Sequence, residues 1–350
     1  MTETFEQKTE TSTEPNLDEI FEEEKPSFSN WAFERDHHFL DMMKEDADTF
    51  KSELQELKNE ENPKLSLIET KKKIIQKTQL RIKNWEKLIA AEDSFKEYMK
   101  SLQKLGENNK LPSYNDIKEI IAPFYEFTMG KHGKAYTEYK DTLILARQTF
   151  DSYYSKAYHL RDLYEILTKE FINEFGKYLA ARIKSIEKEK GQLVRIVEVG
   201  AGDGMLAHFL REKLADLSQE NFELIATDKS PQGYNKEYIV EEMDYQTALD
   251  KLKPDIVISS WMSLGCNWTP AFRQADSVQE YILIGDYSAT GGLASYHESS
   301  EGKEAVAEDG FVMKPIEKAQ KYLIPHGLDS FHPEIHSNPS GIESFKRVKT

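Results

Sequence analysis

The spacing of hydrophobic residues changes partway along this chain of 350 residues. From residue 29 to about 190 they recur at helical intervals, and Ile68, Ile75, Ile82 and Ile89 stand seven residues apart. Such a narrow seam suits the antiparallel pairing of two helices. Beyond residue 190, short β-branched runs alternate with helical patterns, which is typical of an α/β sheet with helices packed on it.

These patterns predict individual elements. Helices are expected at residues 29–60, from 66 to about 105, at 114–127 and at 134–190, the last with breaks near Ser152 and Gly176. Strands are expected at 194–199, 222–227, 238–243, 254–260, 281–284 and 342–348. Residues 1–28 are acidic and poor in apolar side chains, so we expect them to be disordered.

The most informative stretch joins the strand 194–199 to a helical pattern that begins at Met205. Glu198, Gly200, Gly202 and Gly204 occupy alternate positions in this turn. Glycine lets a ligand approach the backbone closely, and an open α/β sheet binds nucleotides at such a strand–turn–helix junction. A dinucleotide fingerprint would need a third glycine where Met205 stands. A tight turn without a ligand is the alternative explanation of the glycines.

This turn resembles motif I of the class I S-adenosylmethionine-dependent methyltransferases, and the resemblance extends over residues 190–290. It implies an α/β fold with a seven-stranded doubly wound sheet in the C-terminal half. It also implies S-adenosylmethionine as cofactor and S-adenosylhomocysteine as product. The cofactor-binding residues that it implies are Glu198, Gly200, Ala201, Gly202, Asp203, Gly204, Asp228, Lys229, Met243, Asp244, Tyr245, Ser259, Ser260 and Trp261.

Two acids carry specific roles under this resemblance. Asp228, at the end of the second strand, would accept hydrogen bonds from the ribose hydroxyls, because a carboxylate can take two donors. Asp244 would accept from the adenine amino group, with Met243 and Tyr245 beside the ring. Two alternatives stay open for Asp244: the neighbouring Glu241 and Glu242 compete for the role, and Asp244 could simply cap the helix 246–251.

The end of the fourth strand, at Ser259 to Met262, has no proline. It therefore lacks the Asn/Asp/Ser-Pro-Pro-aromatic tetrad of enzymes that methylate exocyclic amines of bases or glutamine amides. Methylation of DNA bases is accordingly disfavoured. The loop 261–268 contains two tryptophans and is expected beside the transferring methyl group, where they either contact an acceptor or cover the sheet edge.

The C-terminal region matches the family by order alone. Thr269 and Pro270 suit the N-cap and first position of a helix, while residues 290–293 and 298–304 are expected to be mobile. A helix at 316–322 and the strand 342–348 would complete the sheet with an antiparallel hairpin. Asp286, Tyr287, His297, His132, His37 and His38 are candidates for a base, but none is singled out as catalytic.

Composition limits the partners. The net charge is −16, which makes nucleic acid an unlikely partner and leaves a small molecule or a protein as the expected substrate. The single cysteine, Cys266, supplies neither a disulfide nor a multi-cysteine zinc site, and no metal is expected. No apolar run reaches the length of a membrane span and the N-terminus is not a secretory signal, so a cytoplasmic location is expected. The oligomeric state is left open.

We therefore predict an acidic tail at 1–28, a helical domain or extension at 29–190, and a methyltransferase domain at 191–350. The predicted function is transfer of a methyl group from S-adenosylmethionine to a small-molecule or protein acceptor. The helical domain would cap the pocket or dock the substrate. The alternative is a catalytically inactive methyltransferase-like scaffold that acts through its helical domain.

Overall fold

The computed structural model describes residues 27–59, 65–119, 157–158, 165–231, 235–287, 290–325 and 340–348. The chain divides into two compact units, Met1–Glu92 and Asp93–Thr350. The predicted tail, apart from its last two residues, lies outside the described residues, as do most of the predicted helix 114–127 and residues 134–156 and 159–164. The predicted division into domains at residue 190 stays a prediction.

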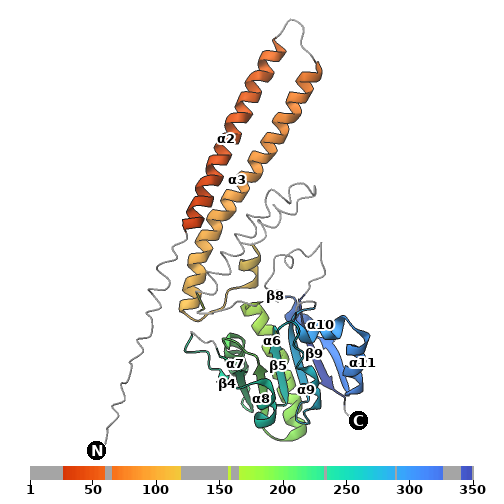
Figure 1. Cartoon of the computed structure of the whole chain (residues 1–350). Coiled ribbons are helices and arrows are strands. Elements are labelled where there is room, and N and C mark those ends of the chain that lie inside the picture. The colour runs from red at the N-terminus through yellow and green to blue at the C-terminus, as the bar shows by residue number, and fades with distance from the viewer. Residues whose placement is uncertain are drawn as a thin grey trace, which may run out of the picture. The chain divides into compact units, whose positions relative to one another are not determined.

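The first unit contains a long helical hairpin (Figure 1). Helix α2 (Ser27–Lys58) pairs with the first part of α3 (Leu65–Glu107). Ion pairs join Lys44 to Glu86 and Lys71 to Glu53, which makes the pairing antiparallel as predicted. Buried between the helices are Leu40, Met43, Ala47, Ile68 and Ile75. The predicted burial of isoleucines at seven-residue spacing is thus confirmed for Ile68 and Ile75, while Ile82 is only partly buried.

The second unit contains a seven-stranded sheet in the order β4-β3-β2-β5-β6-β9-β7 (Figure 1). Its strands are β2 (Val194–Val199), β3 (Phe222–Asp228), β4 (Glu241–Glu242), β5 (Ile256–Ser260), β6 (Glu280–Asp286), β7 (Phe311–Pro315) and β9 (Ser340–Arg347). Only β9 runs antiparallel to its neighbours β6 and β7. The predicted α/β fold is confirmed. The strand order reverses between β2 and β5, where open α/β sheets bind ligands.

Helices cover both faces of this sheet. On one face, Val197 and Val199 pack in a core with residues of α8 (Tyr245–Leu252), α9 (Thr269–Gln274), α10 (Gly291–His297) and α11 (Ser300–Glu308). The other face is covered by α6 (Lys169–Lys190) and α7 (Met205–Asp216). Because side chains alternate along a strand, Ile196 and Glu198 point to this second face. The strand that carries the motif is therefore buried on both sides, as its composition predicted.

The helical tract predicted for residues 134–190, with breaks near Ser152 and Gly176, is interrupted at a different place. Residues Glu165–Ile166 form strand β1, which pairs antiparallel with β8 (Ile324–Pro325). Helix α6 starts only afterwards, because the Thr168 hydroxyl caps it by accepting from the Phe171 N–H at 3.2 Å. Gly176 does not break α6. A Cβ there would lie 2.5 Å from Cγ of Lys213 on α7, so this glycine allows the two helices to pack closely.

Several C-terminal predictions also need correction. Residues 290–293 and 298–304, expected to be mobile loops, lie in or next to the helices α10 and α11, and strand β7 was not predicted. The helix expected at 316–322 is limited to α12 (Glu317–Gln320), and the strand expected at 238–243 to β4. Thr269 was expected to be the N-cap of its helix, but it is the first residue of α9 and Trp268 is the N-cap. The side chain of Asn267 accepts from the Thr269 N–H at 3.1 Å.

The packing between β6 and β9 offers a test of stability. Phe345 of β9 is 1% exposed and its ring stacks on Tyr281 of β6 with 4.6 Å between centroids. Phe345→Ala should lower the free energy of unfolding by about 3–5 kcal/mol, because it removes a fully buried ring and leaves a cavity. Val312→Ala on the neighbouring β7 is the control, since Val312 is 47% exposed and should cost about 0.5 kcal/mol or less. Urea denaturation followed by near-ultraviolet circular dichroism would measure both. Equal effects would contradict the assignment of Phe345 to the core.

Candidate functional site

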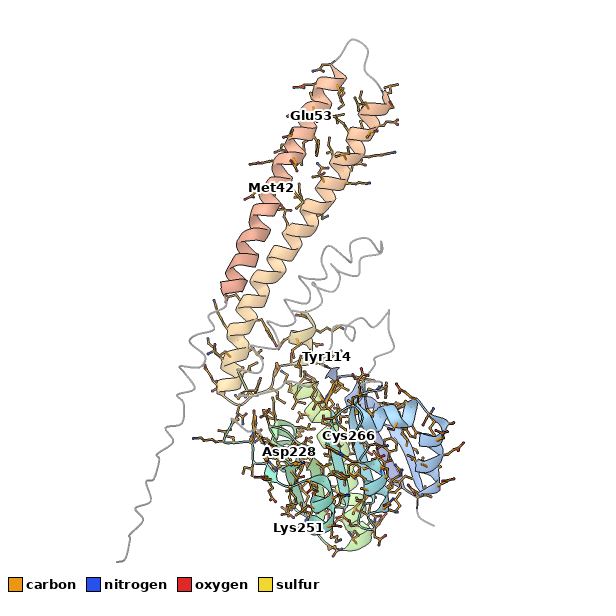
Figure 2. All side chains as sticks on the ribbon, in the orientation of Figure 1. Met42, Glu53, Tyr114, Asp228, Lys251 and Cys266 are labelled. Carbon is orange, nitrogen blue, oxygen red and sulfur yellow. The ribbon has the colours of Figure 1, made fainter. Side chains whose placement is uncertain are left out.

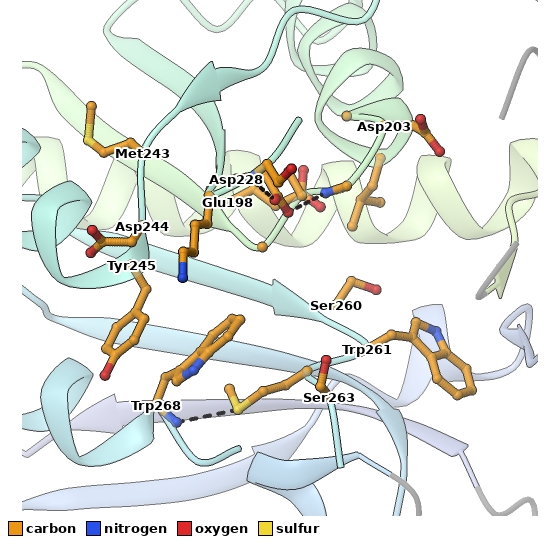
Figure 3. A pocket seen from close by; sticks show the side chains of 18 of the residues that line it. Glu198, Asp203, Asp228, Met243, Asp244, Tyr245, Ser260, Trp261, Ser263 and Trp268 are labelled. Atoms are coloured by element: carbon orange, nitrogen blue, oxygen red, sulfur yellow. Dashed lines mark hydrogen bonds between the residues drawn. The ribbon is translucent and has the colours of Figure 1, made fainter. Parts of the chain in front are cut away.

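A cavity of about 670 Å³ opens at the carboxyl ends of β2, β3 and β5. Figure 2 shows the side chains of both units, and Figure 3 shows those around the cavity. Every residue predicted to bind the cofactor lines it, with the exception of Ser259. The sheet thus brings together, in one hollow, residues that lie as far apart in the chain as Glu198 and Trp261.

The glycine turn forms the floor of the cavity. Gly200 and Gly202 have φ angles of 67° and 56°, in the left-handed region that side chains disfavour. A Cβ on Gly200 would also lie 2.9 Å from the ring of Trp268, whereas nothing stands within 4 Å of one on Gly202. Gly200 is therefore required by packing as well as by conformation. At Gly202 the backbone faces open space, so a ligand can approach its atoms directly.

Asp228 connects this turn to the next strand (Figure 3). Its Oδ2 accepts from the N–H of Gly202 at 2.9 Å, and its Oδ1 accepts from the N–H of Ser230 at 2.8 Å. Each oxygen uses one lone pair in this way, and a carboxylate oxygen has two. The half-buried carboxylate is consequently held in a fixed orientation while retaining acceptor capacity towards the cavity.

Asp244, Tyr245 and Trp268 line another part of the cavity (Figure 3). Asp244 caps α8, accepting from the N–H and from the hydroxyl of Thr247, each at 2.9 Å. The Thr247 N–H first, and its hydroxyl next, hold the pKa of Asp244 below its usual value. The capping alternative for Asp244 is confirmed, and its contact with adenine stays a prediction. Tyr245 stacks on Trp268 with 5.0 Å between ring centroids, forming a flat aromatic surface.

Two acids lie at the buried end of the cavity. Glu198 is 2% exposed, and burial, followed by the charge of nearby Glu165, raises its pKa to about 8. Burial also raises the pKa of Glu165 to about 7. The Oε2 atom of each forms no hydrogen bond of good geometry among the described residues, although the Trp261 side chain lowers the pKa of Glu165 and the Ala207 N–H that of Glu198. Glu165 belongs to β1, and sequence reasoning missed it, because it falls within a stretch of helical pattern.

The end of β5 faces Glu165. The hydroxyl of Ser260 donates to Glu165 Oε1 at 3.1 Å. Trp261 follows with a backbone φ of 52°, which is unusual for a residue with such a large side chain. Its backbone N–H donates to the carbonyl of Ile284 at 2.8 Å. Ser259 is buried and does not line the cavity, unlike the other residues predicted to bind the cofactor. Successive residues of a strand point to opposite faces, and Ser260 takes the position facing the cavity.

None of the candidate bases that the structure describes lines the cavity. Nε2 of His297 lies 2.9 Å from both carboxylate oxygens of Glu343, and the ring of Tyr287 packs against the imidazole at 4.4 Å between centroids. Asp286 is likewise absent from the lining. His132 and the side chains of His37 and His38 lie outside the described residues. Within the described part of the chain, no three His, Cys, Asp or Glu side chains are grouped to hold a metal ion.

Known proteins resemble this chain only in structure. No family model and no curated protein matches the sequence. Among solved structures, DszA carbon methyltransferase matches with 16% identity and a TM-score of 0.32, over 49% of this chain and 53% of its own. The plantazolicin methyltransferase BpumL, solved with SAH, has 10% identity and a TM-score of 0.32, over 73% and 99%. The human methyltransferase 10 domain containing protein has 10% identity and a TM-score of 0.32, over 57% and 95%.

These resemblances are distant. The chain spans about half the length of the DszA structure, and such low identity does not identify an activity or an acceptor. In the described part of the chain, no helix combines the length and apolar composition needed to cross a bilayer.

The buried acids predict how stability depends on pH. The unfolded chain loses the Glu198 proton near the ordinary glutamate pKa of 4.5, whereas the folded chain keeps it until about pH 8. Between these values the folded state binds more protons, so the free energy of unfolding should fall as pH rises. Glu198→Gln should flatten this slope and exceed wild type in stability at pH 8 by on the order of 2 kcal/mol.

The measurement is urea denaturation from pH 5 to 8. Glu242→Gln, on the exposed edge strand β4, serves as the matched control and should follow the wild-type curve. A Glu198→Gln curve parallel to that of wild type would show that Glu198 titrates normally in the folded protein.

Proposed function

We propose that this chain is a methyltransferase that uses S-adenosylmethionine to methylate a small-molecule or protein acceptor. The observation that carries the proposal is the arrangement of Asp228 on the glycine turn, with both carboxylate oxygens oriented by backbone N–H groups beside the cavity. A turn that served folding alone would need neither the acid nor the open space at Gly202.

The chemistry of the lining fits this cofactor. Asp228 would hold the ribose hydroxyls, and the stacked pair Tyr245 and Trp268, with Met243, would offer apolar contact to the adenine. Five lining acids, Glu165, Glu198, Asp203, Asp228 and Asp244, outnumber the one lining lysine, Lys229. S-adenosylmethionine carries a sulfonium and an ammonium against one carboxylate, so its net positive charge complements such a lining.

When bound, the cofactor supplies a methyl group on sulfonium sulfur, which an acceptor displaces in line. The contribution of the chain is to orient the two reactants and to exclude water. Trp261 and Met262 follow β5 at the cavity, where they would cover the reacting groups from solvent. We propose no nucleic-acid substrate, given the net charge of −16. A cytoplasmic location also stays a proposal.

Calorimetric titration with S-adenosylhomocysteine tests the cofactor site. Wild type should bind saturably, and Asp228→Ala should weaken binding by roughly 10- to 100-fold, because it removes charge-assisted hydrogen bonds to the ribose. Asp250→Ala is the matched control, since Asp250 is an exposed aspartate on α8 outside the cavity. Absence of saturable heat with wild type would instead favour the inactive scaffold.

Incubation with S-adenosylmethionine labelled on its methyl group and a fractionated cell extract then tests catalysis. Label is expected in the small-molecule or protein fraction, and the Asp228→Ala variant should transfer less. Label in nucleic acid would contradict the proposed acceptor class.

A further inference from the structure

The helical hairpin of the first unit carries exposed apolar side chains on one of its two broad sides. Met42 on α2 is 47% exposed, and Leu67 and Ile74 on α3 are 40% and 38% exposed. Leu67 and Ile74 stand seven residues apart, about two turns, so they share a side of α3. Lys71 lies between them in the sequence and forms an ion pair with Glu53 of α2, which is about three turns from Met42. These five residues mark one broad side of the hairpin, the apolar side.

The opposite broad side has a different composition. Lys44 and Glu86 form an ion pair across it at 3.0 Å. Lys51 and Gln79 stand seven residues from Lys44 and Glu86, respectively, so they lie on the same side, and both are exposed. Among the described residues exposed on this side, Leu65 at the first position of α3 is the apolar exception. Exposed apolar residues grouped on one side of an element mark it as an interaction surface.

The charges of the two helices identify what this surface fits. Residues 40–58 of α2 include six acidic and three basic side chains, whereas residues 65–83 of α3 include six basic and one acidic. The two interhelical ion pairs place these segments side by side in the hairpin. The surface therefore offers an acidic helix next to a basic one. A second copy of the same hairpin presents the complementary charges to both helices at once.

Symmetry selects how two copies can meet. If the two-fold axis runs along the helices, α2 of each copy faces α3 of the other, and every helix is antiparallel to its neighbours, as in a four-helix bundle. If the axis runs across the helices, acidic α2 faces acidic α2. Only the first arrangement brings opposite charges together. The part of α3 within the first unit makes the face about 40 Å long and about 20 Å wide. This is on the order of 800 Å², the area that each partner of a stable complex buries.

We propose that the hairpin is a dimerisation element, in which the apolar sides of two copies of this chain pack face to face into an antiparallel four-helix bundle with α2 of each copy against α3 of the other. Removal of Met42, Leu67 and Ile74 from water drives the association. The charged residues add little affinity and mainly select the arrangement. The inference is independent of the proposed function, because no residue of the apolar side lines the cavity.

Sedimentation of the full chain tests for the dimer. Over about 1 to 100 μM, wild type should approach twice the 40.5 kDa mass of one chain, since interfaces of this size associate at micromolar concentrations or below. Added salt should weaken the dimer, because it screens the complementary charges. A wild type that keeps the mass of one chain throughout this range would overturn the proposal.

Substitution of Ile74 locates the interface. Ile74→Glu should raise the dissociation constant by roughly 100-fold, because it places a charge in the interface against the acidic α2 of the other copy. Within its own helix the new acid stands three residues from both Lys71 and Lys77, a spacing that stabilises a helix, so loss of the dimer would not reflect unfolding. Gln79→Glu adds the same charge to the opposite side and should stay within about 3-fold of wild type. Equal effects of the two substitutions would contradict the assignment of the interface to the apolar side.

Ile74→Lys tests which helix faces α3. Because the proposed neighbour is acidic, Ile74→Lys should dimerise roughly 10-fold more tightly than Ile74→Glu. The reverse order would place α3 against the basic α3 of the other copy and would overturn the proposed arrangement. Far-ultraviolet circular dichroism should show the same helix content in wild type and all three variants.

Discussion

The hydrogen bond from the Gly202 N–H to Asp228 joins the ends of two neighbouring parallel strands, and the site depends on it. It can form because Gly202 adopts a positive φ, which turns its N–H towards β3. The Ser230 N–H fixes the other carboxylate oxygen, so Asp228 has little rotational freedom left to lose. A group oriented before its ligand arrives binds with a smaller entropic penalty. The same backbone conformation therefore shapes the turn and prepares the binding group.

Charge in the cavity reflects a conflict between stability and ligand binding. Glu198 is buried on β2, and the backbone N–H of Ala207, in the first turn of α7, lowers its pKa. An apolar residue at this position would pack without an electrostatic penalty. The positive end of the α7 dipole offsets part of this penalty. Burial nevertheless raises the pKa of Glu198, which shows that the offset is incomplete.

The parts of this structure that could be predicted are those that depend on residues close together in the sequence. The β-branched run before Gly200 and the acid at the end of the next strand, Asp228, follow from residue spacing within about thirty positions. Ser260 could have been separated from Ser259 by the alternation of a strand. Glu165 could not have been found in this way. Its position depends on two-residue strands paired across the chain, Glu165–Ile166 with Ile324–Pro325, and such short strands have no periodicity to detect.

Two segments upstream of the sheet pack against it, and only the one that carries Glu165 lines the cavity. Glu165 enters directly from β1, whereas Asn109, just after α3, lies 2.7 Å from Nε2 of His208 and accepts from the Tyr238 hydroxyl at 3.2 Å. His208 belongs to the helix that follows the glycine turn, and Tyr238 precedes β4. A doubly wound sheet alone would supply Asp228 and the glycines. At the buried end of the cavity, Glu165 comes from outside the sheet, whereas Glu198 belongs to β2, so this end combines the shared fold with the upstream chain.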